Sequence, residues 1–234
     1  MRKISTAGTA VLACLVVGVA ATGCTDGGGT SAEPSATQML DDANAAMSDL
    51  KSVTIETATE VTGGVDRSSH LVTDLRATCA YRSDSASGAR IDQIRIDGSD
   101  YIRPNRAHME ESGRKVAGKG EQKLWVKELS SESQPGDGLT DCTHEFTSFG
   151  KAVKGAEGES SEIDGVPTVL LKVADKENNG EFGFHVATEG KPYILKVVYK
   201  DATFESTTSF SAFDEPLDVR PPGKDEVVDM SGVG

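Results

Sequence analysis

The chain has 234 residues, of which 37% are hydrophobic and 26% are charged, and this composition excludes a disordered or fibrous protein. Arg2 and Lys3 are the only charged residues among the first 23, so the rest of the chain holds 22 basic and 37 acidic side chains, a net charge of −15. Such an acidic body repels phosphate groups, which excludes nucleic acid as the main partner.

Residues 1–23 have the pattern of an export signal. The two basic residues precede an apolar segment of 12 residues from Ala10 to Ala21. At about 1.5 Å per helical residue, this segment is much shorter than the roughly 30 Å hydrocarbon core of a bilayer. The pattern therefore favours a cleaved leader over a permanent membrane span.

The end of the leader, Ala21-Thr22-Gly23-Cys24, resembles the lipobox of bacterial lipoproteins. This resemblance implies cleavage between Gly23 and Cys24 and acylation of the Cys24 sulfur, which anchors the chain to the extracytoplasmic face of the cell membrane. The alternative is an ordinary secretory leader with a chance cysteine, and it leaves the coincidence of small residues and cysteine unexplained. Residues 24–34 are rich in Gly, Ser and Thr and are expected to form a flexible tether.

A helix of about four turns is predicted after the tether. Ser35 and Gln38 have the spacing of a capping box, and apolar residues then recur at intervals of three and four residues. The predicted apolar positions are Met39, Leu40, Ala43, Ala46, Met47, Leu50 and Val53. Asp41, Asp42 and Asp49 are predicted to face the solvent.

Strands are predicted from Val53 onward, because the hydrophobic period changes to two. The first runs from Val53 to Val61, and the same period continues from Leu71 through Leu75 to Tyr81. A second, shorter helix is predicted from Asp141 to Val153. Further strands are predicted at 169–173, 181–188, 193–199 and 204–213, each bounded by turn residues.

Two cysteines, Cys79 and Cys142, remain after Cys14 leaves with the leader and Cys24 is acylated. An isolated pair of cysteines in an exported protein most simply forms one disulfide. A redox or metal site is the alternative, but the chain has no CxxC motif and no histidine at ligand spacing from either cysteine.

The order helix, strands, helix, strands predicts an α+β domain over residues 35–219, followed by a C-terminal tail at 220–234. About seven antiparallel strands are expected to form a curved sheet, wrapped toward a half-barrel, with helices packed on its concave side.

Four segments resemble the LppX/LprAFG family of Gram-positive lipoproteins, which is similar in fold to the lipoprotein carrier LolA. They are DLKSVTIE (49–56), IRIDGSDYIR (94–103), TEGKPYILKVVY (188–199) and FDEPLDVRPPGKDEVVDM (213–230). The resemblance implies a half-barrel with an apolar cavity that binds lipids or acylated glycolipids within the cell envelope.

Residues predicted to line such a cavity come from the helix, the first strands and the second helix: Met39, Ala43, Met47, Leu50, Ile55, Leu75, Phe146 and Phe149. Small and flexible side chains such as Ala and Met fill irregular space poorly, which favours a hollow. The sequence also leaves open an anchored protein-interaction or sensor domain with a closed core and an envelope protein as its partner.

No catalytic, cofactor or metal site is predicted. The chain has no GxSxG motif, and His70, His108, His144 and His185 are scattered. One stretch is basic against the acidic background: Arg103, Arg106, Arg114, Lys115, Lys119 and Lys123 fall within 21 residues. This stretch is predicted to be a solvated loop, with anionic head groups at a cavity mouth as the functional alternative.

Overall fold

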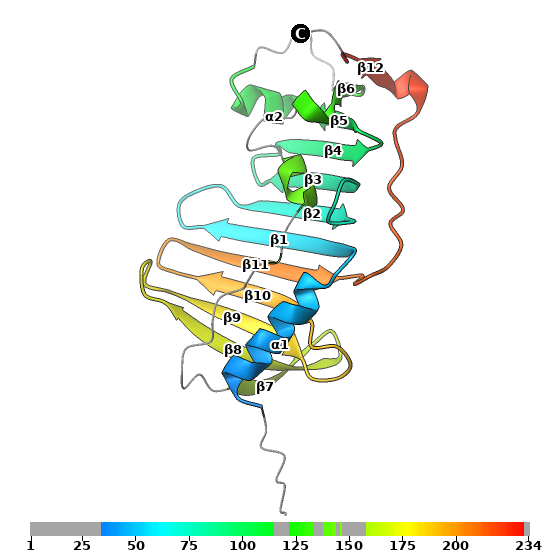
Figure 1. The fold of residues 1–234 in the computed structure, drawn as a ribbon. Coiled ribbons are helices and arrows are strands. Elements are labelled where there is room, and N and C mark those ends of the chain that lie inside the picture. The colour runs from blue at the N-terminus through cyan, green and yellow to red at the C-terminus, as the bar shows by residue number, and fades with distance from the viewer. Residues whose placement is uncertain (1–33, 115–121, 133–137, 144–145, 147–157, 232–234) are drawn as a thin grey trace, which may run out of the picture. The chain divides into compact units, whose positions relative to one another are not determined.

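The computed structural model describes residues 34–114, 122–132, 138–143, 146 and 158–231, and most of them belong to one β-sheet (Figure 1). Within these ranges the strands are β1 (Val53–Val61), β2 (Arg67–Thr73), β3 (Cys79–Ser85), β4 (Arg90–Ile96), β5 (Ser99–Pro104), β6 (Trp125–Leu129), β7 (Gly158–Ile163), β8 (Val166–Asp175), β9 (Gly180–Ala187), β10 (Ile194–Lys200), β11 (Phe204–Ser211) and β12 (Val227–Asp229). The helical elements are α1 (Ala36–Ser48), α2 (Arg106–Glu111) and the 3₁₀ turns η1 (Ser130–Glu132), η2 (Gly138–Thr143) and η3 (Lys224–Glu226).

The strand order is β12-β6-β5-β4-β3-β2-β1-β11-β10-β9-β8-β7, so the first strand lies in the middle of the sheet. On one side of β1, strands β2 to β6 follow in chain order as antiparallel neighbours. On the other side, β11 pairs with β1 and leads back to β7. β12 alone among the described strands is parallel to its neighbour, β6.

The protein is therefore mostly β, with more strands and fewer helical residues than the sequence predicted. Polar strands such as β7, with the sequence GESSEI, lack the alternation that marks a half-buried strand and are held by pairing with a neighbour. The predicted helix at 141–153 is also wrong at its start, because residues 138–143 form the 3₁₀ turn η2. Apart from residue 146, the rest of that segment lies outside the described residues.

α1 agrees with its prediction. The side chain of Ser35 caps its first turn by accepting a hydrogen bond from the Gln38 backbone N–H at 3.2 Å. Leu40, Ala43 and Met47 are buried along one face of the helix, whereas Asp41, Asp42 and Asp49 are exposed. This apolar face lies on the half of the sheet that contains β8 to β11 (Figure 1).

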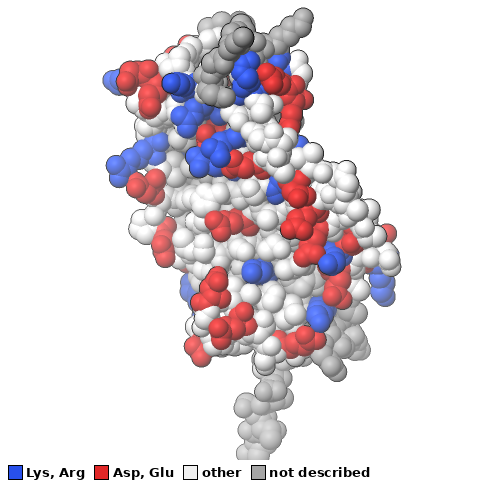
Figure 2. All heavy atoms as spheres, turned by 180° about the vertical axis from the view of Figure 1, so that it is seen from behind, with Lys and Arg blue, Asp and Glu red and all other residues white. Residues whose placement is uncertain are grey.

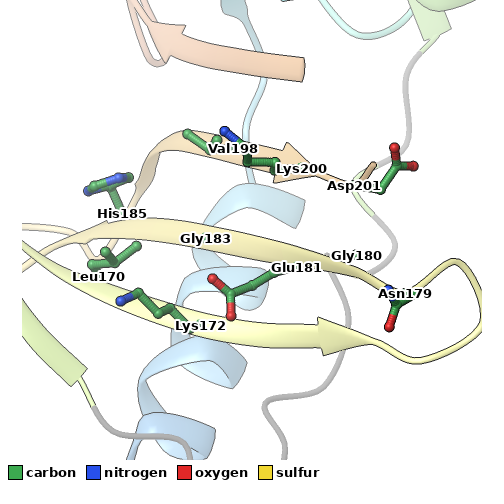
Figure 3. A pocket seen from close by; sticks show the side chains of 10 residues that line it. All are labelled: Leu170, Lys172, Asn179, Gly180, Glu181, Gly183, His185, Val198, Lys200 and Asp201. Atoms are coloured by element: carbon green, nitrogen blue, oxygen red, sulfur yellow. The ribbon is translucent and has the colours of Figure 1, made fainter. Parts of the chain in front are cut away.

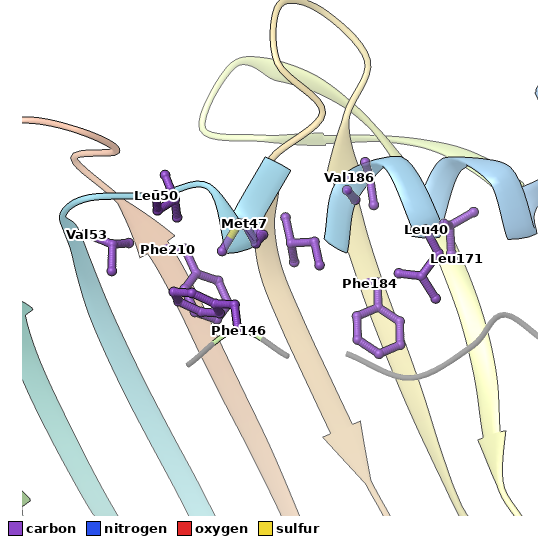
Figure 4. Close-up of a cluster of buried hydrophobic side chains, with 11 residues drawn as sticks. Leu40, Met47, Leu50, Val53, Phe146, Leu171, Phe184, Val186 and Phe210 are labelled. Carbon is purple, nitrogen blue, oxygen red and sulfur yellow. The ribbon is translucent and has the colours of Figure 1, made fainter. Parts of the chain in front are cut away.

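The main hydrophobic cluster lies between α1 and that half of the sheet (Figure 4). Phe184 and Leu171 contact the helix from β9 and β8, and Phe146 packs edge-on against Phe210 with the ring centroids 5.9 Å apart. The buried members are Leu40, Ala43, Met47, Leu50, Val53, Phe146, Leu171, Phe184, Val186, Ile194 and Phe210. The face of the sheet that carries α1 and η2 is called the inner face below, and the opposite one the outer face.

Outside this core, three further segments differ from their predicted structure. The strand predicted through Leu75 is broken, because the Asp74 carboxylate accepts hydrogen bonds from the backbone N–H groups of residues 76, 77 and 78, and Leu75 has a φ of 59°. α2 lies in the stretch that was predicted to be a loop, with Asn105 as its N-cap. Residues 220–234, expected to be a tail, include η3 and β12.

No helix among the described residues is both long enough and apolar enough to cross a bilayer.

Candidate functional site

Two rows of inner-face residues with different side-chain sizes cross the centre of the sheet. The pairing register places Phe210, Ile55, Leu71 and Tyr81 side by side on β11, β1, β2 and β3. The neighbouring row consists of Val197, Thr208, Thr57, Ser69 and Ser83. Because Thr and Ser are much smaller than Phe or Leu, this second row leaves space above the sheet.

That space is a hollow of about 340 Å³, which we call the apolar hollow. Its volume lies within the range of roughly 300–1,000 Å³ that is typical of ligand pockets. Its lining residues are Ile55, Thr57, Ser69, Leu71, Tyr81, Asp141, Phe182, Val197, Thr208 and Phe210. Most of the lining is aliphatic or aromatic, so the hollow suits a hydrocarbon better than a polar ligand.

η2 borders the apolar hollow on the side of β2 and β3, and three attachments hold it to the sheet. A disulfide joins Cys142 of η2 to Cys79 of β3, as the sequence predicted, with the two Cα atoms 5.5 Å apart. The Thr73 hydroxyl donates a hydrogen bond to the Cys142 carbonyl oxygen at 2.6 Å. Arg95 Nη1 donates another to the Leu139 carbonyl oxygen at 3.0 Å. The wall of the hollow is therefore fixed covalently and by hydrogen bonds.

Arg95 is itself held by a buried carboxylate. Asp100 accepts hydrogen bonds from Arg95 Nε at 2.7 Å and Nη2 at 2.6 Å, and a third from the Ser130 hydroxyl at 2.7 Å. The Asp100 side chain is 1% exposed and that of Arg95 is 14% exposed. This two-pronged ion pair orients the guanidinium that supports η2.

Replacing Asp100 with asparagine is expected to lower the free energy of unfolding by about 2 kcal/mol, because Arg95 loses its charged partner in a buried site. Urea denaturation measures this change. Asp84→Asn is the matched control, since its partner Arg90 is 51% exposed and Asp84 is 37% exposed, and it should cost under about 1 kcal/mol. Equal costs for the two variants would contradict a structural role for the Arg95–Asp100 pair.

A second hollow, of about 520 Å³, lies on the inner face between α2 and the strands β2 to β6. We call it the polar hollow, and its lining residues are Arg67, Tyr81, Ser83, Ile91, Gln93, Ile102, Pro104, His108, Met109, Ser112, Arg114, Gln122, Val126, Glu128 and Gly138. Tyr81 lines both hollows, and η2 contributes Gly138 to one and Asp141 to the other. A Cβ atom at Gly138 would overlap the Tyr81 ring, so glycine is required for this contact.

The outer face carries acidic and basic side chains together, and the basic ones gather toward the β3–β6 end (Figure 2). There Asp92 binds Arg82 Nε at 2.6 Å and Arg103 Nη2 at 3.3 Å, and the Arg103 guanidinium lies 4.3 Å from the centre of the Trp125 ring. Asp92 therefore compensates part of the charge of Arg82 and Arg103, and the face of the Trp125 ring further stabilises the Arg103 guanidinium.

An open groove of about 500 Å³ lies on the outer face of β8, β9 and β10 (Figure 3). Its floor is Gly183, which lies opposite Lys172 on β8 and Val198 on β10. The groove is bordered by side chains of both charge signs, Lys172, Lys200, Glu181 and Asp201. Within the described residues no cluster of His, Cys, Asp or Glu is arranged to hold a metal ion.

The structure distributes the predicted cavity residues over several environments. Ile55 lines the apolar hollow, and Ala43, Met47, Leu50 and Phe146 are buried in the main cluster. Met39 and Leu75 pack against the edge of that cluster. Phe149, Gly23 and Cys24 lie outside the described residues. Contact of any of these residues with a ligand stays a prediction.

Sequence reasoning missed the small residues that create the apolar hollow, above all Thr57, Ser69 and Thr208. A signal was present, since the segments 53–61 and 204–211 are rich in Thr and Ser at alternating positions. Hydroxyl-bearing residues on the inward side of a strand indicate that no bulky core group packs there. Thr57 and Thr208 lie 3.4 Å apart between their hydroxyl oxygens, so each provides a polar partner for the other.

One comparison with solved structures shows the fold of this chain. No family model and no curated protein sequence matches the chain. LprF from Mycobacterium bovis superposes with a TM-score of 0.52 at 12% identity, over 82% of this chain and 98% of that one. This chain has the LprF fold. The resemblance that the sequence indicated is therefore confirmed for the fold.

Two other solved structures also match over most of their length. The lipoprotein LppX from Mycobacterium tuberculosis gives a TM-score of 0.40 at 16% identity, over 81% of this chain and 100% of that one. A LolA superfamily protein from Nitrosomonas europaea gives 0.29 at 11% identity, over 82% and 96%.

Proposed function

We propose that this protein is a lipid-anchored lipoprotein of the extracytoplasmic membrane face whose domain binds or shuttles a lipid or another acylated ligand without catalysing a reaction. The observation that carries this proposal is the apolar hollow, a space of about 340 Å³ with a mostly hydrocarbon lining. The LprF fold supports it, because it agrees with the fold that the resemblance to the LppX/LprAFG family implies. The sheet is then a half-barrel around the ligand.

The energetics favour an alkyl ligand in this hollow. Each Å² of apolar surface removed from water contributes roughly 25 cal/mol, and the ligand and the lining both lose exposed surface on binding. Two hydroxyl groups of the floor cost little to cover, since Thr57 and Thr208 pair with each other. An acyl chain therefore gains burial without leaving these two hydroxyl groups unpaired.

The predicted leader and tether would place this function at the membrane surface. Acylation at Cys24 would fix the chain to the membrane, and residues 24–34 would let the domain reach lipids in the bilayer. Binding and release of a hydrophobic ligand close to its source needs such a tether, because the free ligand is poorly soluble in water.

Native mass spectrometry tests the proposal. Both hydrophobic clusters are built from described residues between 36 and 213, so a form that begins at Thr25 keeps the whole sheet and its core. Purified from a lipid-rich host, this form should carry a hydrophobic adduct. Ser69→Phe places a ring in the hollow and is expected to lower the occupied fraction about tenfold, since the ring takes the volume of the ligand.

Ser68→Phe is the matched control, because residue 68 is the exposed neighbour on the outer face of the same strand. It should leave the adduct unchanged, and circular dichroism should show both variants folded. A wild-type spectrum without an adduct, together with failure to bind added lipid, would contradict the proposal. The remaining hypothesis would then be an anchored protein-interaction or sensor domain with an envelope protein as its partner.

A further inference from the structure

The polar hollow differs in chemistry from the apolar hollow beside it. Ser83, Ser112 and Gln122 contribute polar side chains, and Arg67, Arg114 and His108 contribute basic ones. Tyr81 belongs to both linings, so the two hollows are direct neighbours on the inner face. The inner face thus offers mostly hydrocarbon surroundings over β1, β10 and β11 and mixed surroundings over β3 to β6, where Ile91, Ile102, Pro104 and Val126 lie among the polar side chains.

Two arginines of the polar hollow differ from most other described arginines, because they form no ion pair with a described carboxylate. Six of the nine arginines in the described ranges form ion pairs: Arg82, Arg90, Arg95, Arg103, Arg106 and Arg220. Arg67, Arg76 and Arg114 have no carboxylate within 4.0 Å in the described part of the chain. Arg67 and Arg114 both line the polar hollow, although the protein as a whole is strongly acidic.

His108 on α2 is affected by the charges of both arginines and of Glu111. Burial lowers the pKa of His108, and the positive charges of Arg114 and Arg67 lower it further, against the opposite effect of Glu111. The imidazole of His108 therefore senses both guanidinium groups and the Glu111 carboxylate.

Glu128 is the only carboxylate among the described lining residues of this hollow. It lies on β6, four strands away from Arg67 on β2, which corresponds to about 19 Å across the sheet. At that separation its charge is largely screened from Arg67. Glu111, which also acts on His108, is the carboxylate near the other side, so the side with His108 holds two guanidinium charges against one carboxylate charge.

We propose that the ligand is an amphiphile with a phosphate-bearing, anionic head group, whose tail occupies the apolar hollow while Arg67 and Arg114 bind the head group in the polar hollow. This inference rests on the lipid-binding function proposed above. Guanidinium groups present planar, paired N–H donors that match the oxygens of a phosphate, and two of them satisfy one phosphate better than one. The volume of about 520 Å³ leaves space for further hydroxyl groups of the head beside Ser83, Ser112 and Gln122.

Two single-chain amphiphiles with the same tail test this inference: myristoyl lysophosphatidylglycerol, which has an anionic phosphate head group, and sucrose monomyristate, whose head group has no phosphate and no charge. Titration below their micelle concentrations, followed by calorimetry on the form that begins at Thr25, should show about tenfold tighter binding of the anionic lipid. Arg67→Gln/Arg114→Gln should lower the affinity for the anionic lipid about tenfold and leave that for the other amphiphile unchanged, given the modest strength of exposed ion pairs.

Arg76→Gln is the matched control, because Arg76 is a third arginine without a carboxylate partner among the described residues and lies in the turn before β3, outside both hollow linings. It should bind both amphiphiles as the wild type does. Equal binding of the two amphiphiles, insensitive to Arg67 and Arg114, would overturn the head-group assignment and leave the lipid-binding function intact. Failure of both amphiphiles to bind would overturn the function as well.

Inorganic phosphate is the third ligand in this experiment. It should fail to displace the anionic lipid at millimolar concentration, because it lacks the tail that the apolar hollow binds. Saturable, arginine-dependent phosphate binding that displaces no lipid would assign the polar hollow to a free anion and overturn the amphiphile.

Discussion

Replacing both Cys79 and Cys142 with alanine is expected to lower the free energy of unfolding by roughly 4 kcal/mol. The disulfide closes a loop of 63 residues, and the entropy that this closure removes from the unfolded chain accounts for a stabilisation of that size. Both cysteines are fully buried beside Leu71 and Leu139, so alanine leaves small apolar side chains in an apolar site. Guanidinium denaturation under oxidising conditions measures the difference.

The reductant supplies the control for this prediction. Reduced wild-type protein should unfold near the midpoint of the double variant, whereas the double variant should not respond to reductant. Limited proteolysis should also increase at η2, since the Thr73 and Arg95 hydrogen bonds then hold it alone. Two free thiols in the exported protein, or an unchanged unfolding midpoint in the double variant, would show that the bridge does not form in the cell.

The elements that the sequence predicted are those whose local pattern and tertiary environment agree. α1 has a cap at Ser35 and a single apolar stripe, and β1 alternates over its whole length from Val53 to Val61. The predicted strands at 169–173, 181–188, 193–199 and 204–213 correspond to β8, β9, β10 and β11. Each of these strands faces the main cluster on one side, so burial imposes the period-two pattern.

The hollows depend on the register in which the strands pair, and a single sequence does not specify this register. Thr57 and Thr208 are separated by 151 residues, and they become neighbours only because β1 pairs with β11 in one particular register. Ala43 and Met47 on the helix, which were expected to border a cavity, are buried in the main cluster, and their contact with a ligand stays a prediction.

The sequence does not predict the helix α2, and the reason is different. Four of its six residues are polar and it buries none of the six, so no hydrophobic period marks it. The Asn105 side chain accepts a hydrogen bond from the His108 backbone N–H at 2.9 Å and another from the Arg90 backbone N–H at 2.9 Å. The second bond ties the helix start to β4 from 15 residues away, a contact that local sequence rules do not include.

Replacing Cys24 with alanine is expected to abolish acylation and with it the stable attachment of the domain to membranes. Each buried CH₂ group contributes roughly 0.8 kcal/mol, and two acyl chains hold a protein where one gives only reversible binding. Metabolic labelling with an alkyne-tagged fatty acid should label the wild type and leave Cys24→Ala unlabelled.

Cys14→Ala is the matched control, because it removes a cysteine from the predicted leader and should keep the label and the membrane fraction of the wild type. A form whose leader is exchanged for one cleaved before Thr25 separates anchoring from processing, since it carries neither acyl chains nor an apolar segment of its own and should be recovered in the aqueous phase of a detergent partition. Retention of unlabelled Cys24→Ala in carbonate-washed membranes, with the apolar segment at 10–21 still attached, would instead assign the anchor to an uncleaved leader.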